Sequence, residues 1–452
     1  MTRDLTSGSV WKHIIILAIS MTLGNAIQQL YSMVDTVIVG QVLGEQPLAG
    51  VGSTASLNFM IVFFCMGICA GCGIPVAREF GAGNYASLRK YVTNSVWVCA
   101  AFCVVITVLS CIFCGTFLRW LSTPDEIFAY ARDYIFVIFI GLACTFFYNL
   151  LASVIRGLGD AKTPLIALVI SSVVNIGLDF AFMLWIPMGV AGAALATVIA
   201  QGLSGLYCFM VLKRKFDILK MQPGEWKLNK IVVKSLCKLG VPMGFQYSIT
   251  AIGLLVVQSA INGFGTAAVS GMSVANKVRL LIACPLDAIG QIMTPFAGQN
   301  LGAGQFKRIK EGLWKTTLLG LGWSVLITIP FTLIAGRSIV GIFLSDPSAD
   351  IIEYAYTYLM CTNLFNIFLT LVNVFRFTIQ GMGYTGLSMI SGVMETVGRA
   401  FAGIVLANVM GYEGAALGSS LAWILADCFL VPAFFICYKK VSSRGEAAVS
   451  KQ

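Results

Sequence analysis

Residues 14–40 decide the fold; they read IIILAISMTLGNAIQQLYSMVDTVIVG, an apolar run with one carboxylate, Asp35, near its end. A bilayer core about 30 Å thick is crossed by roughly 20 apolar helical residues, so this run is long enough to span a membrane. On a helix, Asn25, Gln28, Ser32 and Asp35 form one polar stripe. An ionised Asp at mid-bilayer costs about 2.5 to 3.5 kcal/mol, so the stripe cannot face lipid. Asp35 is therefore either a structural hydrogen-bond partner or an ion or proton site, and we favour the second.

The composition of the whole chain agrees with a membrane protein. Of its 452 residues, 58% are hydrophobic and only 11% are charged, and the mean hydropathy is +0.86. Such a chain has too few polar side chains to cover a water-soluble globule. The apolar runs are continuous and do not alternate, which excludes a membrane β-barrel and indicates helices. The first run is too long for a signal peptide, and we expect it to be retained. The predicted class is an all-α polytopic membrane protein.

Other function classes are disfavoured by what the chain lacks. The 14 cysteines lie mostly in apolar runs, where they pack as small hydrophobes. His13, the only histidine, begins the first run and suits an interfacial anchor. The net charge of +10 is not concentrated on a soluble domain, so no nucleic-acid partner is expected. Neither GxxxxGK[ST] nor HExxH occurs, and we predict no enzyme activity, no cofactor and no metal other than a Na⁺ at a cation site.

Twelve apolar runs predict twelve transmembrane helices. They cover residues 14–40, 49–77, 92–118, 130–155, 164–187, 189–212, 239–262, 268–298, 316–335, 353–379, 387–410 and 414–438. Lys and Arg concentrate in alternate connections, and with these we count residues 213–238 and Arg376, near the end of the tenth run. The opposite connections hold only Arg119, Arg132 and Arg337. By the positive-inside rule both termini are cytoplasmic.

The second half of the chain repeats the first. FGAGNY at 80–85 recurs as LGAGQF at 301–306, and MGVAGAAL at 188–195 recurs as MGYEGAAL at 410–417. Each repeat holds six spans, so both enter the membrane in the same direction and form two six-helix bundles related by a pseudo-two-fold axis along the membrane normal. We predict an N-terminal lobe at 1–213, a cytoplasmic basic linker at 214–238, and a C-terminal lobe with a short cytoplasmic tail at 239–452. This is the plan of a two-lobed transporter, with its substrate path between the lobes.

Polar side chains inside the first-half spans form a candidate cation site. The candidates are Asp35, Asn149, Asn175, Asp179 and Thr197. Asn175 and Asp179 are four residues apart and share one helix face. Two carboxylates with neutral oxygens suit a hard cation such as Na⁺. Two nearby carboxylates also suit proton binding, because they cannot both ionise at low cost.

The second half breaks this symmetry. Gln258 takes the place of Asp35, and Glu395 with Arg399, also four apart, takes the place of the Asn175 and Asp179 pair. An acid and a base at that spacing can neutralise each other, so we assign the ion site to the first lobe. Whether Glu395 and Arg399 are structural or gating stays open. The candidate gating or cavity residues are Gln28, Gln258, Asp287, Glu395 and Arg399.

Several of these motifs resemble those of one transporter family. The run GNAIQQLYSMVDT at 24–36, LAGVG at 48–52, the GAG turns and the duplicated twelve-span plan are similar to the multidrug and toxic compound extrusion (MATE) family, in its prokaryotic DinF-like branch. The resemblance implies export of cationic or amphipathic organic compounds in exchange for Na⁺ or H⁺. It also implies that the five first-lobe residues act together as the cation site.

The chain departs from the family pattern at two points. Many relatives carry a proline about fifteen residues before the first-helix acid, and here that position is Ser20, so bending that relies on the proline is in doubt. No acid lies in the middle of the seventh span, where some other branches of the family have one. We expect a monomeric antiporter for multidrug efflux in the cell membrane, with small organic substrates and the lipid bilayer as its partners. A flippase for a lipid-linked precursor is the alternative. The sequence decides neither the substrates, nor the ion, nor the stoichiometry.

Overall fold

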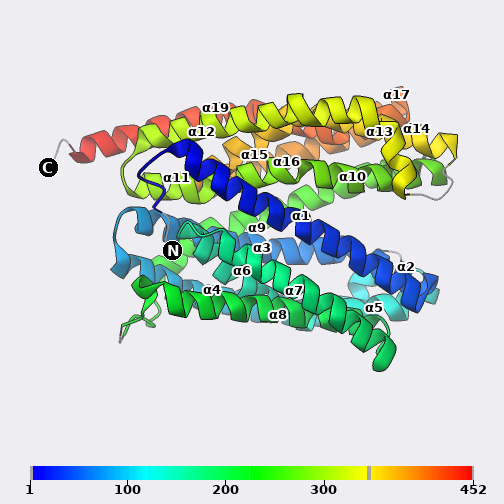
Figure 1. Cartoon of the computed structure of the whole chain (residues 1–452), viewed down its shortest axis with the longest axis horizontal. Coiled ribbons are helices and arrows are strands. Elements are labelled where there is room, and N and C mark those ends of the chain that lie inside the picture. Colours follow the sequence, from blue (N-terminus) through cyan, green and yellow to red (C-terminus); the bar gives the residue numbers. More distant parts are fainter. Residues whose placement is uncertain (1–3, 122, 223, 344–347, 450–452) are drawn as a thin grey trace. The chain divides into compact units, whose positions relative to one another are not determined.

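The computed structural model describes residues 4–121, 123–222, 224–343 and 348–449, and these are almost entirely helical (Figure 1). Ten helical segments are long and apolar enough to cross a membrane. Two further spans are bent pairs, Asp125–Ile140 with Leu142–Gly157 (α5 and α6, 47°) and Ala349–Asn363 with Asn366–Gly381 (α14 and α15, 46°). Counting each pair as one span gives twelve, so the predicted all-α polytopic class is confirmed.

The remaining helices are long, and several continue into a short π-helical turn. The spans are α1 (Val10–Leu43), α3 (Ala55–Gly81), α4 (Tyr85–Trp120), α7 (Lys162–Phe180), α8 (Val190–Lys215), α9 (Lys230–Asn262), α10 (Thr266–Gln291) with α11 (Met293–Gly302), α12 (Phe306–Trp323) with α13 (Ile329–Phe343), α16 (Thr385–Phe401) with α17 (Ala407–Met410), and α19 (Gly418–Val449). The short helices α2 (Glu45–Ser53) and α18 (Tyr412–Ala416) lie between spans. The second apolar run, predicted as one helix over 49–77, is therefore divided between α2 and α3.

The backbone repeats in the two halves as the sequence does. Gly83 and Gly304, in the two GAG turns, have φ of 68° and 70°. Gly189 and Gly411, which open the two MG turns, share φ near 60° and a ψ of −141°. Only glycine adopts these conformations without strain. The repeated glycines therefore hold equivalent turns in equivalent places, which explains why they stand out in the sequence.

By its contacts the chain divides into two units. Unit 1 comprises Met1–Asp4 and Leu23–Ser248, and unit 2 comprises Leu5–Thr22 and Ile249–Gln452. Helices α1 and α9, the first span of each half, thus begin in one unit and end in the other. The predicted lobes at 1–213 and 239–452 divide the chain by its repeat rather than by its contacts, and they stay a prediction.

In unit 1, glycines bring α3 and α9 into backbone contact. A Cβ on Gly67 would lie 2.6 Å from the Cα of Gly244, and one on Gly71 would lie 2.4 Å from the Cα of Gly240. Both pairs are spaced four apart, the pattern that lets membrane helices approach closely. Gly141, at the bend between α5 and α6, plays a similar part, because a Cβ there would lie 2.1 Å from Val198 of α8. The last of these contacts holds the α5–α6 bend against α8, the helix that carries Thr197.

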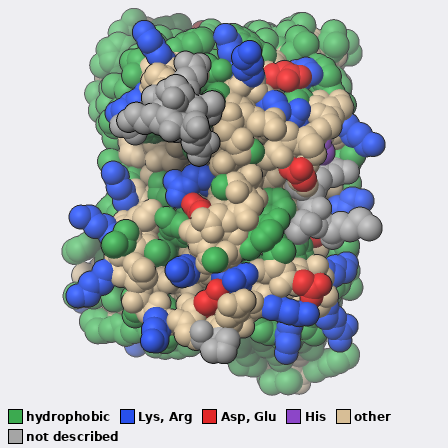
Figure 2. Space-filling model, turned by 90° about the vertical axis from the view of Figure 1, so that its left-hand side faces the viewer, with side chains coloured by type: hydrophobic (Ala, Val, Ile, Leu, Met, Phe, Trp, Pro, Cys, Tyr) green, Lys and Arg blue, Asp and Glu red, His purple; other side chains and the backbone are tan. Residues whose placement is uncertain are grey.

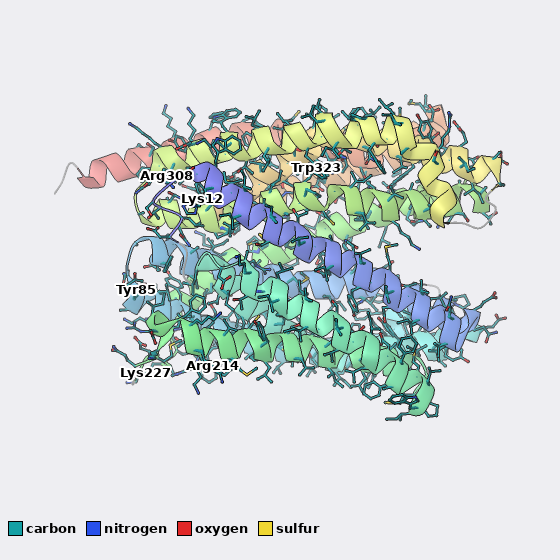
Figure 3. The ribbon with its side chains drawn as sticks, viewed as in Figure 1. Lys12, Tyr85, Arg214, Lys227, Arg308 and Trp323 are labelled. Carbon is teal, nitrogen blue, oxygen red and sulfur yellow. The ribbon has the colours of Figure 1, made fainter. Side chains whose placement is uncertain are left out.

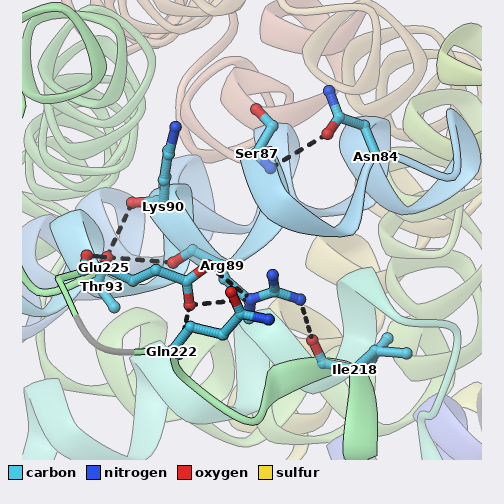
Figure 4. A network of polar contacts seen from close by, with 8 residues as sticks. All are labelled: Asn84, Ser87, Arg89, Lys90, Thr93, Ile218, Gln222 and Glu225. Carbon is cyan, nitrogen blue, oxygen red and sulfur yellow. Dashed lines mark hydrogen bonds and ion pairs between the residues drawn. The ribbon is translucent and has the colours of Figure 1, made fainter.

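The chain before α9 is bound to the start of α4 (Figure 4). Arg89 donates through Nε to both carboxylate oxygens of Glu225, at 2.8 and 2.9 Å, and through Nη1 to the carbonyl of Ile218. Glu225 also accepts from the backbone N–H of Gln222, and Thr93 donates to its carbonyl oxygen. The described part of the basic linker is therefore packed against the start of α4 within unit 1.

An arginine in unit 2 binds the chain before α1 in the same manner. Arg308, at the start of α12, donates to the carbonyls of Gly8 (2.9 Å), Leu5 (3.0 Å) and Ser7 (3.3 Å), and to Oδ1 of Asn300 (Figure 3). Leu5 is fully buried. Arg89, near the start of α4, thus binds the segment before α9, and Arg308, near the start of α12, binds the segment before α1.

Candidate functional site

Asp35 and Asp179 meet inside unit 1. Asp35 lies on α1, and Asp179 lies near the end of α7, where it is fully buried. The two carboxyl groups are within hydrogen-bonding reach of each other. Among the described residues, no donor binds Oδ1 of Asp35 or either oxygen of Asp179. Two carboxylates so placed repel each other unless a proton or a cation lies between them.

Thr197 reaches this pair through a tyrosine that the sequence analysis did not select. The hydroxyl of Thr197, on α8, donates to the carbonyl of Ala193 at 3.1 Å, which leaves its oxygen to accept from the hydroxyl of Tyr31 at 3.3 Å. Tyr31 lies one helical turn before Asp35 and within electrostatic reach of both acids. Its spacing of four from Asp35 was the available signal. Aromatic side chains in a membrane span are usually packing residues, so this spacing alone does not mark Tyr31 as part of an ion site.

A second tyrosine, Tyr134 on α5, also closes the site. It is buried and lies within electrostatic reach of Asp35 and Asp179. No sequence pattern connects residue 134 to residue 35, because only the packing of α5 against the other helices of unit 1 brings them near. Both tyrosines therefore lie in the neighbourhood of the acid pair.

The two asparagines differ in their surroundings. Asn175 is fully buried one turn before Asp179, and both of its amide atoms lack a partner among the described residues. Asn149, on α6, donates its amide to the carbonyl of Thr145 in its own helix, at 2.8 Å. The described contacts do not join Asn149 to the two acids. The structure thus brings Asp35, Asp179 and Thr197 together, with Asn175 on the adjacent turn.

The chemistry of unit 1 suits a small hard cation. Carboxylate, amide and hydroxyl oxygens are the available groups, and they are the donors that such cations accept. Among the residues that the structure describes, no three His, Cys, Asp or Glu side chains group as a metal centre. An unpaired buried amide beside an unpaired acid pair is costly without a ligand. A proton or a Na⁺ at this position would offset that cost.

The candidate gating or cavity residues fall into separate groups. Gln28 is exposed on α1, and Gln258 donates to Asn262 one turn further along α9, at 2.9 Å. Asp287 of α10 accepts from the amide of Asn373 on α15, at 2.9 Å. The described contacts show no bond between Gln258 and Asp287.

Glu395 and Arg399 form the ion pair that their spacing predicts, at 3.1 Å, and both are buried. A third residue joins them, because Arg376 of α15 bonds the other carboxylate oxygen of Glu395. Arg376 was counted with the cytoplasmic connections, and that count was wrong. It lies inside α15, 8% exposed, and its charge is paired with Glu395 within the protein. The carboxylate of Glu395 thus forms ion pairs with two buried guanidinium groups.

Comparison with known proteins gives one consistent result. The family model MatE matches residues 21–181 and 242–405, two segments that begin 221 residues apart, as the repeat does. The probable multidrug resistance protein YpnP of Bacillus subtilis is 27% identical over 448 residues, with 96% of each chain covered. YoeA of the same organism, also a probable multidrug resistance protein, is 28% identical over 375 residues, covering 80% of this chain and 79% of the relative.

Solved structures show the same fold. An outward-facing multidrug resistance MATE family transporter of the MOP superfamily superposes with a TM-score of 0.88 at 21% identity, covering 97% of this chain and 98% of the other. A MATE P26A mutant gives a TM-score of 0.87 at 22% identity over the same shares of the two chains. At this level of identity the likeness concerns the fold.

Proposed function

The chain belongs to the MatE family, and from that premise we propose that it is a secondary active antiporter for multidrug efflux. It exports small cationic or amphipathic organic compounds in exchange for Na⁺ or H⁺, by alternating access. The family membership and the names of the relatives support the export of drugs. The unpaired acids Asp35 and Asp179 carry the ion-coupling part of the proposal.

The coupling follows from the geometry of the acid pair. When the site is empty, the two carboxylates repel each other, and α1 and α7 are pushed apart at this point. When a proton or Na⁺ lies between them, the repulsion is removed and the helices pack closely. The ion therefore binds one arrangement of α1 more tightly than the other, and this difference biases the transporter between its states.

The proposed setting is the cell membrane, with both termini in the cytoplasm and the protein acting as a monomer without a cofactor. The distribution of Lys and Arg between the connections supports this orientation, and Figure 2 shows many Lys and Arg side chains on the face that it presents. The named relatives are transporters rather than enzymes. They do not favour the alternative of a flippase for a lipid-linked precursor.

A reconstituted assay tests the proposal. Purified protein in liposomes, loaded with a fluorescent cationic dye, is given first an inward Na⁺ gradient and then an inward proton gradient. We expect one gradient to drive dye efflux in the wild type and Asp35→Asn to abolish it. Asp133→Asn, an exposed aspartate on α5, is the matched control and should transport normally. Full efflux by a well-folded Asp35→Asn variant would refute the role of the pair.

A further inference from the structure

Unit 2 contains a buried carboxyl group that the proposed cycle does not use. Asp427, in the first half of α19, is 6% exposed. Both of its oxygens are buried, and neither has a hydrogen-bond partner among the described residues. An unpaired carboxylate in such surroundings costs several kcal/mol, far more than an apolar residue of the same size. Because of this cost, we expect the carboxyl group of Asp427 to bind a ligand.

The packing of α19 places Asp427 beside the ion pairs of Glu395. Gly398 of α16 is so close to α19 that a Cβ there would lie 2.7 Å from the Cα of Ala422. On α15, the ring of Phe375 packs edge-on against Phe434 of α19, with centroids 5.5 Å apart. Asp427 lies between these two contacts, and Arg376 is the charged group that acts on it electrostatically.

The neighbouring charges balance when every group is ionised. The charged groups of this cluster are Arg279 and Asp287 on α10, Arg376 on α15, Glu395 and Arg399 on α16, and Asp427 on α19. We call these six residues the second-half charge cluster. On the other helices packed on α19, Lys315 pairs with Glu311, Glu353 pairs with Arg337, and Glu413 is exposed. Three bases face three acids.

We propose that Asp427 is a proton-binding site of the second half, separate from the acid pair of the first. A proton from water forms an O–H bond on one carboxyl oxygen when the site fills, and it returns to water when the site empties. Na⁺ is the less suitable ligand, because it requires several converging oxygens and would lie near the guanidinium of Arg376. A proton needs one oxygen only.

Filling this site changes the charge of the cluster from zero to plus one. This consequence rests on the proposed export of cationic compounds. A cationic substrate in unit 2 would bind more weakly beside the protonated cluster than beside the neutral one, and by linkage the substrate would favour release of the proton. The two ligands would then exclude each other by charge, which is the requirement for exchange.

Infrared spectroscopy tests the site directly in the full-length protein in lipid nanodiscs. A protonated carboxyl group gives a carbonyl-stretch band that shifts in D₂O and disappears as the pH is raised. The measurement uses a background with Asp35→Asn and Asp179→Asn, so that the first-half acids do not contribute. We expect adding Asp427→Asn to remove one titrating band, and adding the control Glu353→Gln to leave it in place. An unchanged spectrum after Asp427→Asn would overturn the proposal.

Two further arms cover the remaining outcomes. Replacing K⁺ by Na⁺ at constant pH should leave the band unchanged, and a shift would identify a metal-cation site instead. If Asp427→Asn does not fold, Asp427→Glu should keep the band at a shifted frequency, and Arg376→Gln should move its midpoint to higher pH, because a positive neighbour is lost. No change in either variant would count against the site. Because the assay does not involve transport, it stands apart from the outcome of dye efflux in Asp35→Asn.

Discussion

The guanidinium Nε of Arg89 lies 2.8 and 2.9 Å from the two carboxylate oxygens of Glu225. The two residues are 136 positions apart, and their bond ties the connection between the halves to the start of α4. Hydrogen bonds of this charged kind contribute about 1.5 to 3 kcal/mol when shielded from water. The entry to α9 is therefore a fixed part of unit 1.

Weakening this bond should loosen the connection. We expect Glu225→Gln to lower the free energy of unfolding by about 1 to 2 kcal/mol and to increase cleavage by trypsin within 213–230, measured by mass spectrometry of the fragments. Asp217→Asn, whose ion pair with Lys220 is exposed, is the control and should change neither quantity. Equal protection in Glu225→Gln and wild type would show that the bond does not hold the segment.

The same bond predicts a pH dependence. Desolvation acts to raise the pKa of Glu225, but the Gln222 N–H and the Arg89 guanidinium outweigh it, so the pKa lies below its ordinary value. A carboxyl with a lowered pKa stabilises the fold fully above its unfolded pKa and loses that contribution as the pH falls through the folded value. Trypsin is inactive in acid, so pepsin cleavage of 213–230 should rise below about pH 4 in wild type. Glu225→Gln should show no such step.

The N-terminal segment should come loose when Arg308 is removed. Arg308→Ala deletes three charge-assisted hydrogen bonds to the carbonyls of Leu5, Ser7 and Gly8, at about 1 to 3 kcal/mol. Hydrogen exchange at residues 5–9 should become faster by tenfold or more, measured by mass spectrometry. Lys307→Ala, the neighbouring base, is the control. Unchanged exchange in Arg308→Ala would contradict the contact.

The glycine contact between α3 and α9 should not tolerate a methyl group. In Gly71→Ala the new Cβ would meet the backbone of Gly240 at 2.4 Å, and backbone cannot turn aside as a side chain can. We expect a loss of about 1 to 3 kcal/mol, seen as a lower temperature for loss of the monodisperse gel-filtration peak. Gly115→Ala on α4, where the space is open, is the control. Equal heat resistance of the two variants would argue against close packing.

Tyr31 should matter for coupling more than for folding. Tyr31→Phe keeps the ring and removes the hydroxyl that meets Thr197 beside the two acids. A lost hydrogen bond of about 0.5 to 1.5 kcal/mol predicts dye efflux slower by roughly two- to tenfold, at normal expression. Tyr85→Phe, an exposed tyrosine at the start of α4, is the control. Wild-type rates in Tyr31→Phe would exclude the hydroxyl from the ion site.

The spans could be predicted from local patterns in the sequence, whereas the joint role of Asp35 and Asp179 was predicted from the resemblance to a known family. Apolar length identifies a membrane helix wherever it occurs, and the spacing of Asn175 and Asp179 fixes one face of α7. Tyr134 and Asp427 were not predicted, because their partners lie on helices that only packing brings near. Arg376 was misplaced for a different reason, since charge near the end of an apolar run is read as a loop residue unless its partner, Glu395, is known.

The passage of α1 and α9 from one unit to the other has a consequence for the history and engineering of the chain. Within one polypeptide it is equivalent to a domain swap, in which each half contributes the beginning of its first helix to the body of the other. A gene cut between residues 229 and 230 would yield two fragments, each lacking a helix segment that the other supplies. Such fragments should fold when they are produced together and not apart, and an ancestor half as long would have needed a second copy of itself.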